Sequence, residues 1–204
     1  MPRCRLPRAV AIVLVVPWTV SAQPPIPGTR DPQSTYEPRS APGAGQKFLA
    51  RFAGDWDVAK TFYPRSGEPA HQKGVCRQTM IQGNRFLKSE FSFERRRQTS
   101  TGLGIIGFDT TTGRFTSVWI DSRRTAMSMR ESRDPFNGSE IVLYSAALAK
   151  PANVGRGSRT VTRLEDEGRR IVHRQYMAGA DGKERLMMEL ILTRKDSAPD
   201  NGKR

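Results

Sequence analysis

The chain has 204 residues, and its 34 lysines and arginines outnumber 20 aspartates and glutamates to give a formal net charge of +14. Two cysteines, Cys4 and Cys76, exclude a fold that is stabilised by several disulfides, so a hydrophobic core must hold the domain together. The apolar run at residues 9–16 is shorter than the roughly 20 residues that a membrane-spanning helix needs.

The first 22 residues have the pattern of a secretory signal peptide. Three arginines precede the apolar run, and Val20 and Ala22 occupy the positions that a signal peptidase reads. We expect cleavage near Ala22 and export to the periplasm or the medium; the alternative is an N-terminal anchor that is not cleaved. Cleavage removes Cys4 and lowers the net charge to +11, because the 22 residues hold three arginines and no acid. We expect the remaining Cys76 to be a small buried side chain rather than a nucleophile.

A proline-rich segment separates the signal peptide from the folded part of the chain. Residues 23–45 hold six prolines and three glycines and few apolar side chains, which is typical of a disordered linker. We expect one domain at residues 46–195 and a flexible tail at residues 196–204. The helical candidate in this domain is residues 45–54, where Phe48, Leu49 and Phe52 share a face.

The rest of the domain reads as short strands separated by turn signals. Ten segments, each rich in apolar or alternating residues, qualify as strands: 56–64, 74–81, 85–94, 103–109, 114–121, 126–132, 139–148, 158–165, 169–177 and 184–194. Glycine-containing turns such as Asn137-Gly138 separate most of them. This spacing predicts an all-β fold, a single antiparallel up-and-down barrel of about ten strands, since closure removes exposed sheet edges.

Gly54-Asp55-Trp56, at the head of the first strand, resembles the opening of lipocalin-like (calycin) barrels. The resemblance implies that Gly54 and Trp56 lie at the barrel floor and that Arg194, on the last strand, stacks on the indole. Such a cation–π contact contributes about 0.5–2 kcal/mol.

Three further stretches carry a more specific resemblance: residues 83–91, 102–122 and 161–195. Together they are similar to a bacterial family known only as a domain of unknown function with a lipocalin-like fold. The resemblance covers about residues 46–195. The chain departs from the pattern at Asn84, where a second glycine is common, and at Arg123-Arg124, where the family has small and apolar residues. The family implies a fold and no activity.

Trp119 and Asp121 are the first candidates for a ligand site. Alternation places Phe115, Trp119 and Asp121 on one face of their strand, which mixes aromatic and polar groups as cavity walls do. Asp121 either lines the barrel interior with a cationic partner (Arg85, Arg123 or Arg130) or ends the strand by capping the next turn. The sequence leaves both readings open.

Other candidates are weaker. Arg85 is either an anion-binding group at the barrel mouth or an ordinary surface arginine, and Glu90 is solvated or paired with a cation. His173 lies well inside a strand; it is either structural or a ligand-binding group, and haem ligation through it is an alternative that no second ligand supports. Met188 belongs to a set of residues expected inside the barrel: Trp56, Val58, Phe62, Phe115, Trp119, Leu186, Met188, Leu190 and Leu192.

These observations favour an exported barrel that binds a small hydrophobic or amphipathic ligand, with no cofactor and no bound metal. The alternative is a packed barrel that uses its basic loops to dock on an anionic membrane surface or a partner protein. We expect no nucleic acid partner for an exported chain. Catalysis ranks last, because the chain shows no nucleophile motif and only Asp121 and Glu90 as candidate acids.

Overall fold

The computed structural model describes residues 33, 36, 40–95, 98–145, 157–179 and 183–195. The expected signal peptide, nearly all of the expected linker and the expected tail lie outside these residues. The chain divides into two compact units, Met1–Arg39 and Ser40–Arg204, and the second unit holds the helix and the strands that follow.

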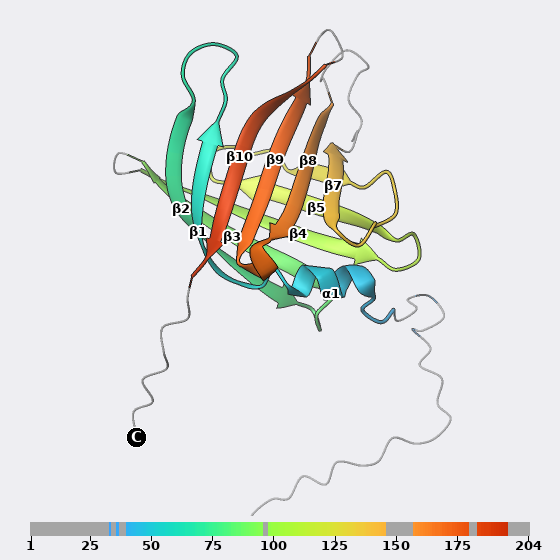
Figure 1. Ribbon diagram of the computed structural model, residues 1–204. Coiled ribbons are helices and arrows are strands. Elements are labelled where there is room, and N and C mark those ends of the chain that lie inside the picture. The colour runs from blue at the N-terminus through green and yellow to red at the C-terminus, as the bar shows by residue number, and fades with distance from the viewer. Residues whose placement is uncertain are drawn as a thin grey trace, which may run out of the picture. The chain divides into compact units, whose positions relative to one another are not determined.

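Ten antiparallel strands close into one barrel (Figure 1). They are β1 (Gly54–Phe62), β2 (Ala70–Ile81), β3 (Phe86–Arg95), β4 (Gln98–Asp109), β5 (Arg114–Asp121), β6 (Ser128–Glu131), β7 (Glu140–Ser145), β8 (Ser158–Glu165), β9 (Arg170–Ala178) and β10 (Glu184–Arg194). Each strand pairs with its neighbours in sequence, and β1 pairs with β10 to complete the circle. The expected fold class and strand number are confirmed. Closure into a barrel pairs the first strand with the last, so that no strand edge is left exposed.

The helix α1 (Ala44–Ala50) lies across one end of the barrel (Figure 1). The Gln46 side chain ties it down: Oε1 accepts from the Gly43 N–H, and Nε2 donates to the Phe108 carbonyl on β4, both at 2.7 Å. The helix is shorter than the expected 45–54, because residues 51–52 form a turn that leads into β1. Gly54 begins β1 with a φ of 139°, which favours glycine.

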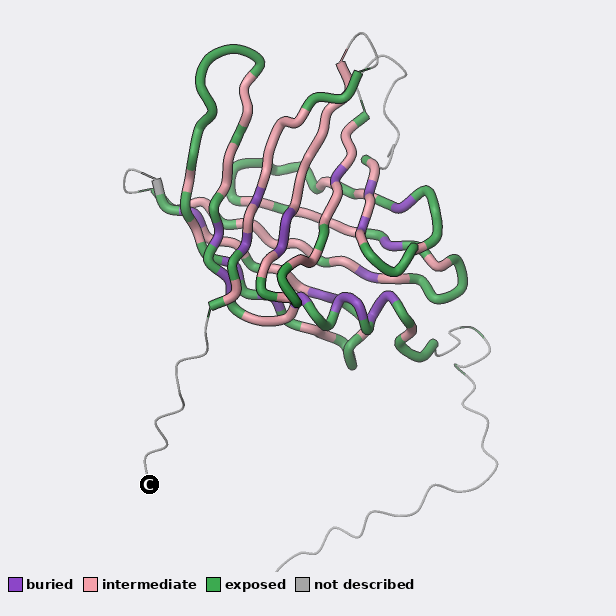
Figure 2. The backbone as a smooth tube through the Cα atoms, in the orientation of Figure 1, coloured by how far each residue is buried: buried purple, intermediate pink, exposed green. Residues whose placement is uncertain are grey.

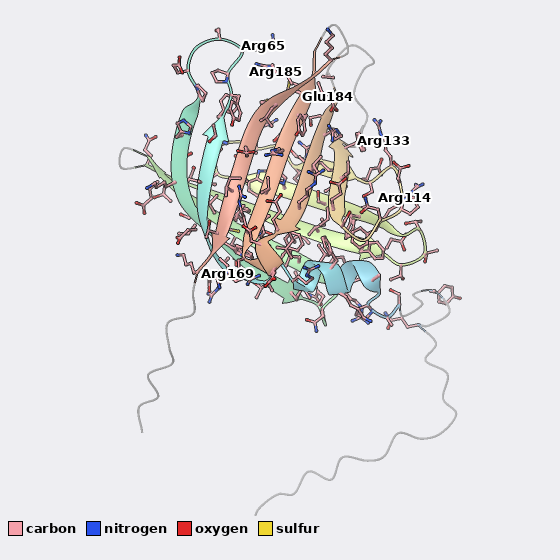
Figure 3. The ribbon with its side chains drawn as sticks, in the orientation of Figure 1. Arg65, Arg114, Arg133, Arg169, Glu184 and Arg185 are labelled. Atoms are coloured by element: carbon pink, nitrogen blue, oxygen red, sulfur yellow. The ribbon has the colours of Figure 1, made fainter. Side chains whose placement is uncertain are left out.

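The barrel is packed at the end that α1 covers, which we call the closed end, and less so at the opposite, open end (Figure 2). Phe48 and Leu49 of α1, with Phe52 just after it, insert into the closed end and are almost fully buried. Turns β2–β3, β4–β5, β6–β7 and β8–β9 lie at the closed end, and the other connections lie at the open end. In Figure 3 the labelled Arg65, Glu184 and Arg185 mark the open end, and Arg169 lies near α1.

Candidate functional site

The floor of the barrel is a tryptophan clamped by an arginine. Trp56 has no exposed surface, and its Nε1 donates to the Phe52 carbonyl at 3.0 Å. The Arg194 guanidinium lies 4.2 Å from the indole and donates to the carbonyls of Arg51, Ala53 and Gly168. A side chain at Gly54 would come within 2.4 Å of this guanidinium. The clamp therefore joins the helical turn, β1, β10 and the β8–β9 turn.

Inward-facing residues fall into two zones along the barrel axis. Near α1 most of them are buried, and we call the buried ones the packed floor: Trp56, Val58, Cys76, Leu87, Phe115, Ile141, Ile171 and Leu192. Toward the open end Phe93 and Thr160 are also buried, but most inward-facing residues keep partial exposure. We call these partly exposed residues the accessible interior: Lys60, Phe91, Gly102, Gly104, Ser117, Trp119, Asp121, Ser128, Arg130, Thr162, His173, Gln175 and Met188. An inward-facing side chain in a closed barrel keeps exposed surface where the interior is not filled. The open half can therefore admit a small molecule.

Trp119 and Asp121 form a hydrogen-bonded pair at the open end of β5. Trp119 Nε1 donates to Asp121 Oδ2 at 3.1 Å, and the Arg123 backbone N–H donates to Asp121 Oδ1 at 2.9 Å. Desolvation alone would raise the pKa of Asp121, but these hydrogen bonds and the nearby arginine side chains hold it below its usual range. The carboxylate thus caps the β5–β6 turn and fixes the indole at the same time.

An aromatic wall runs from β3 to β5 on the inner surface. The Phe91 ring stacks on Phe93 and meets Trp119 edge-on at 5.5 Å. Trp119 lies flat over glycines of β4, where a side chain at Gly102 would come within 2.2 Å of the indole. The glycines therefore make room for the indole, and the wall offers an apolar surface to a ligand.

Lys60 is an interior residue that the sequence reasoning missed. Its Nζ lies 5.0 Å from the centroid of the Phe93 ring. Desolvation, followed by repulsion from Arg123, lowers the pKa of Lys60, and attraction to Asp121 partly offsets this. The two-residue period that placed Trp56 and Phe62 inside also places Lys60 inside, so the signal was present in the sequence.

Arg130 and His173 face the same interior from β6 and β9. His173 Nδ1 lies 2.8 Å from Thr162 Oγ1. Desolvation, followed by repulsion from Arg130, lowers the pKa of His173 to about 4, so the ring is neutral near pH 7. Desolvation also lowers the pKa of Arg130. The interior therefore holds a cation on β6 and a neutral imidazole on β9.

The remaining candidate residues lie in different places. Met188 lines the accessible interior, where it pairs with Phe62 and Gln175. Phe115 is 1% exposed and belongs to the packed floor, against Phe108 and Phe136.

Two expected positions differ in the structure. Arg85 lies in the β2–β3 turn at the closed end, where it donates to the Ser40 carbonyl, so we leave it out of the candidate site. Leu186 was expected inside, but the β9–β10 register shifts between Leu186 and Met188 and pairs Leu186 with Tyr176. That pairing puts it on the outer face, because a bulge reverses the alternation.

Among the described residues, the candidate reactive side chains Cys76 and Glu90 lie in surroundings that do not favour reactivity. Cys76 is buried, and desolvation raises the pKa of its thiol to about 12, so it stays protonated. Glu90 is exposed and pairs with Lys88 at 2.9 Å. In the described part of the chain, no three His, Cys, Asp or Glu side chains are placed to hold a metal ion. No described helix has the length and apolar character needed to cross a bilayer.

Comparison with known proteins agrees with this geometry. A family model described as "Protein of unknown function (DUF1579)" matches residues 41–194. No curated protein matches the chain.

Two solved structures share the barrel fold. The crystal structure of Rv2717c from M. tuberculosis superposes with a TM-score of 0.55 at 12% identity, covering 77% of this chain and 100% of that one. The S-type phycobiliprotein lyase CPES from Guillardia theta superposes with a TM-score of 0.51 at 10% identity, covering 81% and 98%. At such identities the likeness shows the fold alone.

Proposed function

Because the chain belongs to the DUF1579 family of proteins of unknown function and folds as a lipocalin-like barrel, we propose that it is an exported protein that binds a small hydrophobic or amphipathic ligand inside the barrel. The observation that carries the proposal is the contrast between the sealed packed floor and the accessible interior. The signal-peptide pattern supports export. The lipocalin-like fold supports ligand binding, and the kind of ligand rests on this chain's own residues.

The accessible interior combines an apolar surface with a few polar groups. Phe91, Trp119 and Met188 offer apolar surface, and Arg130 and His173 offer hydrogen-bonding groups. Small-molecule sites are typically built this way, with apolar walls for affinity and few polar groups for orientation. Methionine side chains adapt to ligands of different shape.

Native mass spectrometry of the mature protein, purified gently from an exporting host, tests this proposal. We expect a bound mass above that of the polypeptide, and we expect delipidated protein to bind the neutral dye N-phenyl-1-naphthylamine with a change in tryptophan fluorescence. A visible absorption scan of the same sample tests the haem alternative at His173, which a Soret band would support. An apo mass together with no dye binding would overturn the proposal.

A second candidate function is docking on an anionic membrane surface. Exposed arginines lie at the open end: Arg65, Arg123 and Arg124 in loops, and Arg185 near the start of β10 (Figure 3 labels Arg65 and Arg185). Basic residues near an anionic bilayer contribute about 1 kcal/mol each. Sedimentation with phosphatidylglycerol vesicles at low salt, lost at high salt, would support docking; no sedimentation at low salt would exclude it.

A further inference from the structure

The charges inside the barrel are arranged differently from those on its outer surface. Ion pairs join strands across the outside, as Arg163 does with Glu140 and Arg174 with Glu189, both at 2.7 Å. Arg130 faces inward, where a charge costs more, and within the described part of the chain it has no carboxylate partner. An interior guanidinium without a carboxylate partner is able to take an anion from outside the chain as its counter-charge.

Arg130 makes one weak hydrogen bond. Its Nη1 donates to the Ser158 carbonyl at 3.4 Å, which leaves most of its N–H donors without a partner among the described residues. Its direct neighbours across the sheet are Ser117 on β5 and Ser145 on β7. These side chains are small and neutral. They leave space around the guanidinium and offer no charge to balance it.

The carboxylate inside the barrel, that of Asp121, already accepts hydrogen bonds from the protein. Asp121 is the one acid that faces inward from the described strands, and it accepts hydrogen bonds from Trp119 and the Arg123 backbone. Its charge also attracts Lys60 on β1, although the repulsion of Lys60 by Arg123 is larger. The described strands therefore offer Arg130 no second inward-facing carboxylate to balance its charge.

We infer that Arg130 binds the anionic group of an amphipathic ligand, a carboxylate or a chemically similar oxyanion, with His173 as a second contact. This inference rests on the proposed function and adds the chemical class of the ligand. A guanidinium suits this role because its planar N–H fork matches two oxygens of a carboxylate at once.

The position of Arg130 also fixes where the apolar part of the ligand lies. Ser117 pairs with Arg130 across β5–β6, and Trp119 pairs with Ser128 on the same two strands. Trp119 is thus a diagonal neighbour of Arg130, one step closer to the open end. A ligand whose anionic group meets Arg130 places its apolar body on the wall formed by Trp119 and Phe91.

His173 can join the same contact in one of its tautomers. When the Thr162 hydroxyl donates to Nδ1, the ring proton lies on Nε2, which has no partner among the described residues. A neutral imidazole can donate this proton to an oxyanion in a hydrogen bond without placing a second positive charge in the interior with Arg130.

Two naphthylamine dyes that differ in charge test the inference with the delipidated protein. Anilinonaphthalene sulfonate carries an anionic group, and N-phenyl-1-naphthylamine has a similar aromatic body without it. We expect Arg130→Gln to weaken binding of the sulfonate by about tenfold or more, since hydrogen bonds to charged groups are stronger than those between neutral groups. Binding of the neutral dye should change by less than about twofold.

Two further variants distinguish a direct contact between Arg130 and the sulfonate from a general attraction by the positive charge of the protein. Arg130→Lys keeps the charge but not the fork, so we expect it to weaken the sulfonate by less than Arg130→Gln does. Arg114→Gln removes the same charge from an exposed position at the start of β5, and we expect a change below about twofold. The apo form of Arg130→Gln should melt at or above the wild-type Tm, which shows that it is folded.

The outcomes distinguish the two proposals. Equal sulfonate affinity in the wild type and in Arg130→Gln, or an equal loss in Arg114→Gln, overturns the inference and leaves the proposed function standing. Failure of the wild type to bind either dye overturns both. Loss of both dyes in a folded Arg130→Gln protein also overturns the inference, because it would give Arg130 a role in shaping the interior rather than in binding charge.

Discussion

The packed floor and the accessible interior belong to the same ten strands, yet they use arginine in opposite ways. At the floor, Arg194 donates to three backbone carbonyls and stacks on Trp56, so groups of the protein itself surround its guanidinium. In the accessible interior, Arg130 has one long hydrogen bond and no described carboxylate partner. The difference shows that the closed end uses its arginine for stability, and it supports the proposal that the open half binds a ligand.

The same contrast holds for the two described tryptophans. Trp56 is completely buried and bonds to the backbone, whereas Trp119 is partly exposed, bonds to Asp121 and rests on glycines. Natural proteins often hold functional sites in less stable regions, because binding surfaces cannot be optimised for folding alone. Four changes, in order of decreasing expected effect, test this contrast.

Truncating the two tryptophans should separate stability from binding. We expect Trp56→Ala to lower the free energy of unfolding by about 3–5 kcal/mol, because it opens a cavity and leaves the Arg194 guanidinium without its aromatic contact. Trp119→Ala should cost about 2 kcal/mol or less and should abolish dye binding. Urea unfolding followed by circular dichroism measures both. Equal losses of stability would contradict a division into a structural and a binding end.

The partly buried imidazole of His173 should make stability depend on pH. Its pKa in the folded protein is about 4 against an ordinary 6.5, so between these values the unfolded chain binds a proton that the folded protein does not. The free energy of unfolding should therefore fall as the pH drops from 6.5 to 4, by roughly 3 kcal/mol in total, and His173→Gln should remove this fall. Urea unfolding at several pH values measures it; parallel curves for the two proteins would show that the ring titrates normally.

The arginine clamp at the floor should not tolerate lysine. Arg194→Lys keeps the charge but cannot donate to three carbonyls in different directions, and we expect it to cost about 2 kcal/mol. Arg174→Lys is the matched control, because Arg174 forms an ion pair with Glu189 on the outer face and should cost less than about 1 kcal/mol. Thermal unfolding of the two variants measures both losses of stability. A larger loss for Arg174→Lys than for Arg194→Lys would refute the role of the clamp.

The glycine under Trp119 should matter for binding more than for stability. Gly102→Ala places a methyl group against the indole, so we expect about 1 kcal/mol of destabilisation and a shift of Trp119 fluorescence with weaker dye binding. Gly157→Ala is the control, since nothing lies within 4 Å of a side chain at that position. An unchanged emission spectrum in Gly102→Ala would mean that the indole has room to move.

Much of the fold could be predicted from the sequence. Segments 114–121, 158–165 and 184–194 match β5, β8 and β10 in both bounds, because their alternation and flanking turns are local signals. Other bounds differ by several residues, as in β4, which begins at Gln98 rather than at residue 103. The polar residues at the start of β4 belong to the strand because they pair with β3. Their own side chains do not indicate this pairing.

The candidate site was less predictable. Alternation placed Trp119 and Asp121 on the same face, but only the side-chain geometry shows that they bond to each other while Asp121 also caps the turn. Arg85 looked like a candidate for the barrel mouth, whereas the up-and-down order puts its turn at the closed end. Leu186 changed face because of a bulge that no sequence pattern announced.

The sequence by itself determined the all-β class, the number of strands and the Trp56 floor, because side-chain alternation, turn residues and a short motif act over a few neighbouring positions. Only the tertiary structure decided that Arg130, His173 and Lys60 share one interior without enough carboxylates to balance them. Residues from β1, β6 and β9 meet there because the barrel closes, and closure joins positions more than a hundred residues apart along the chain.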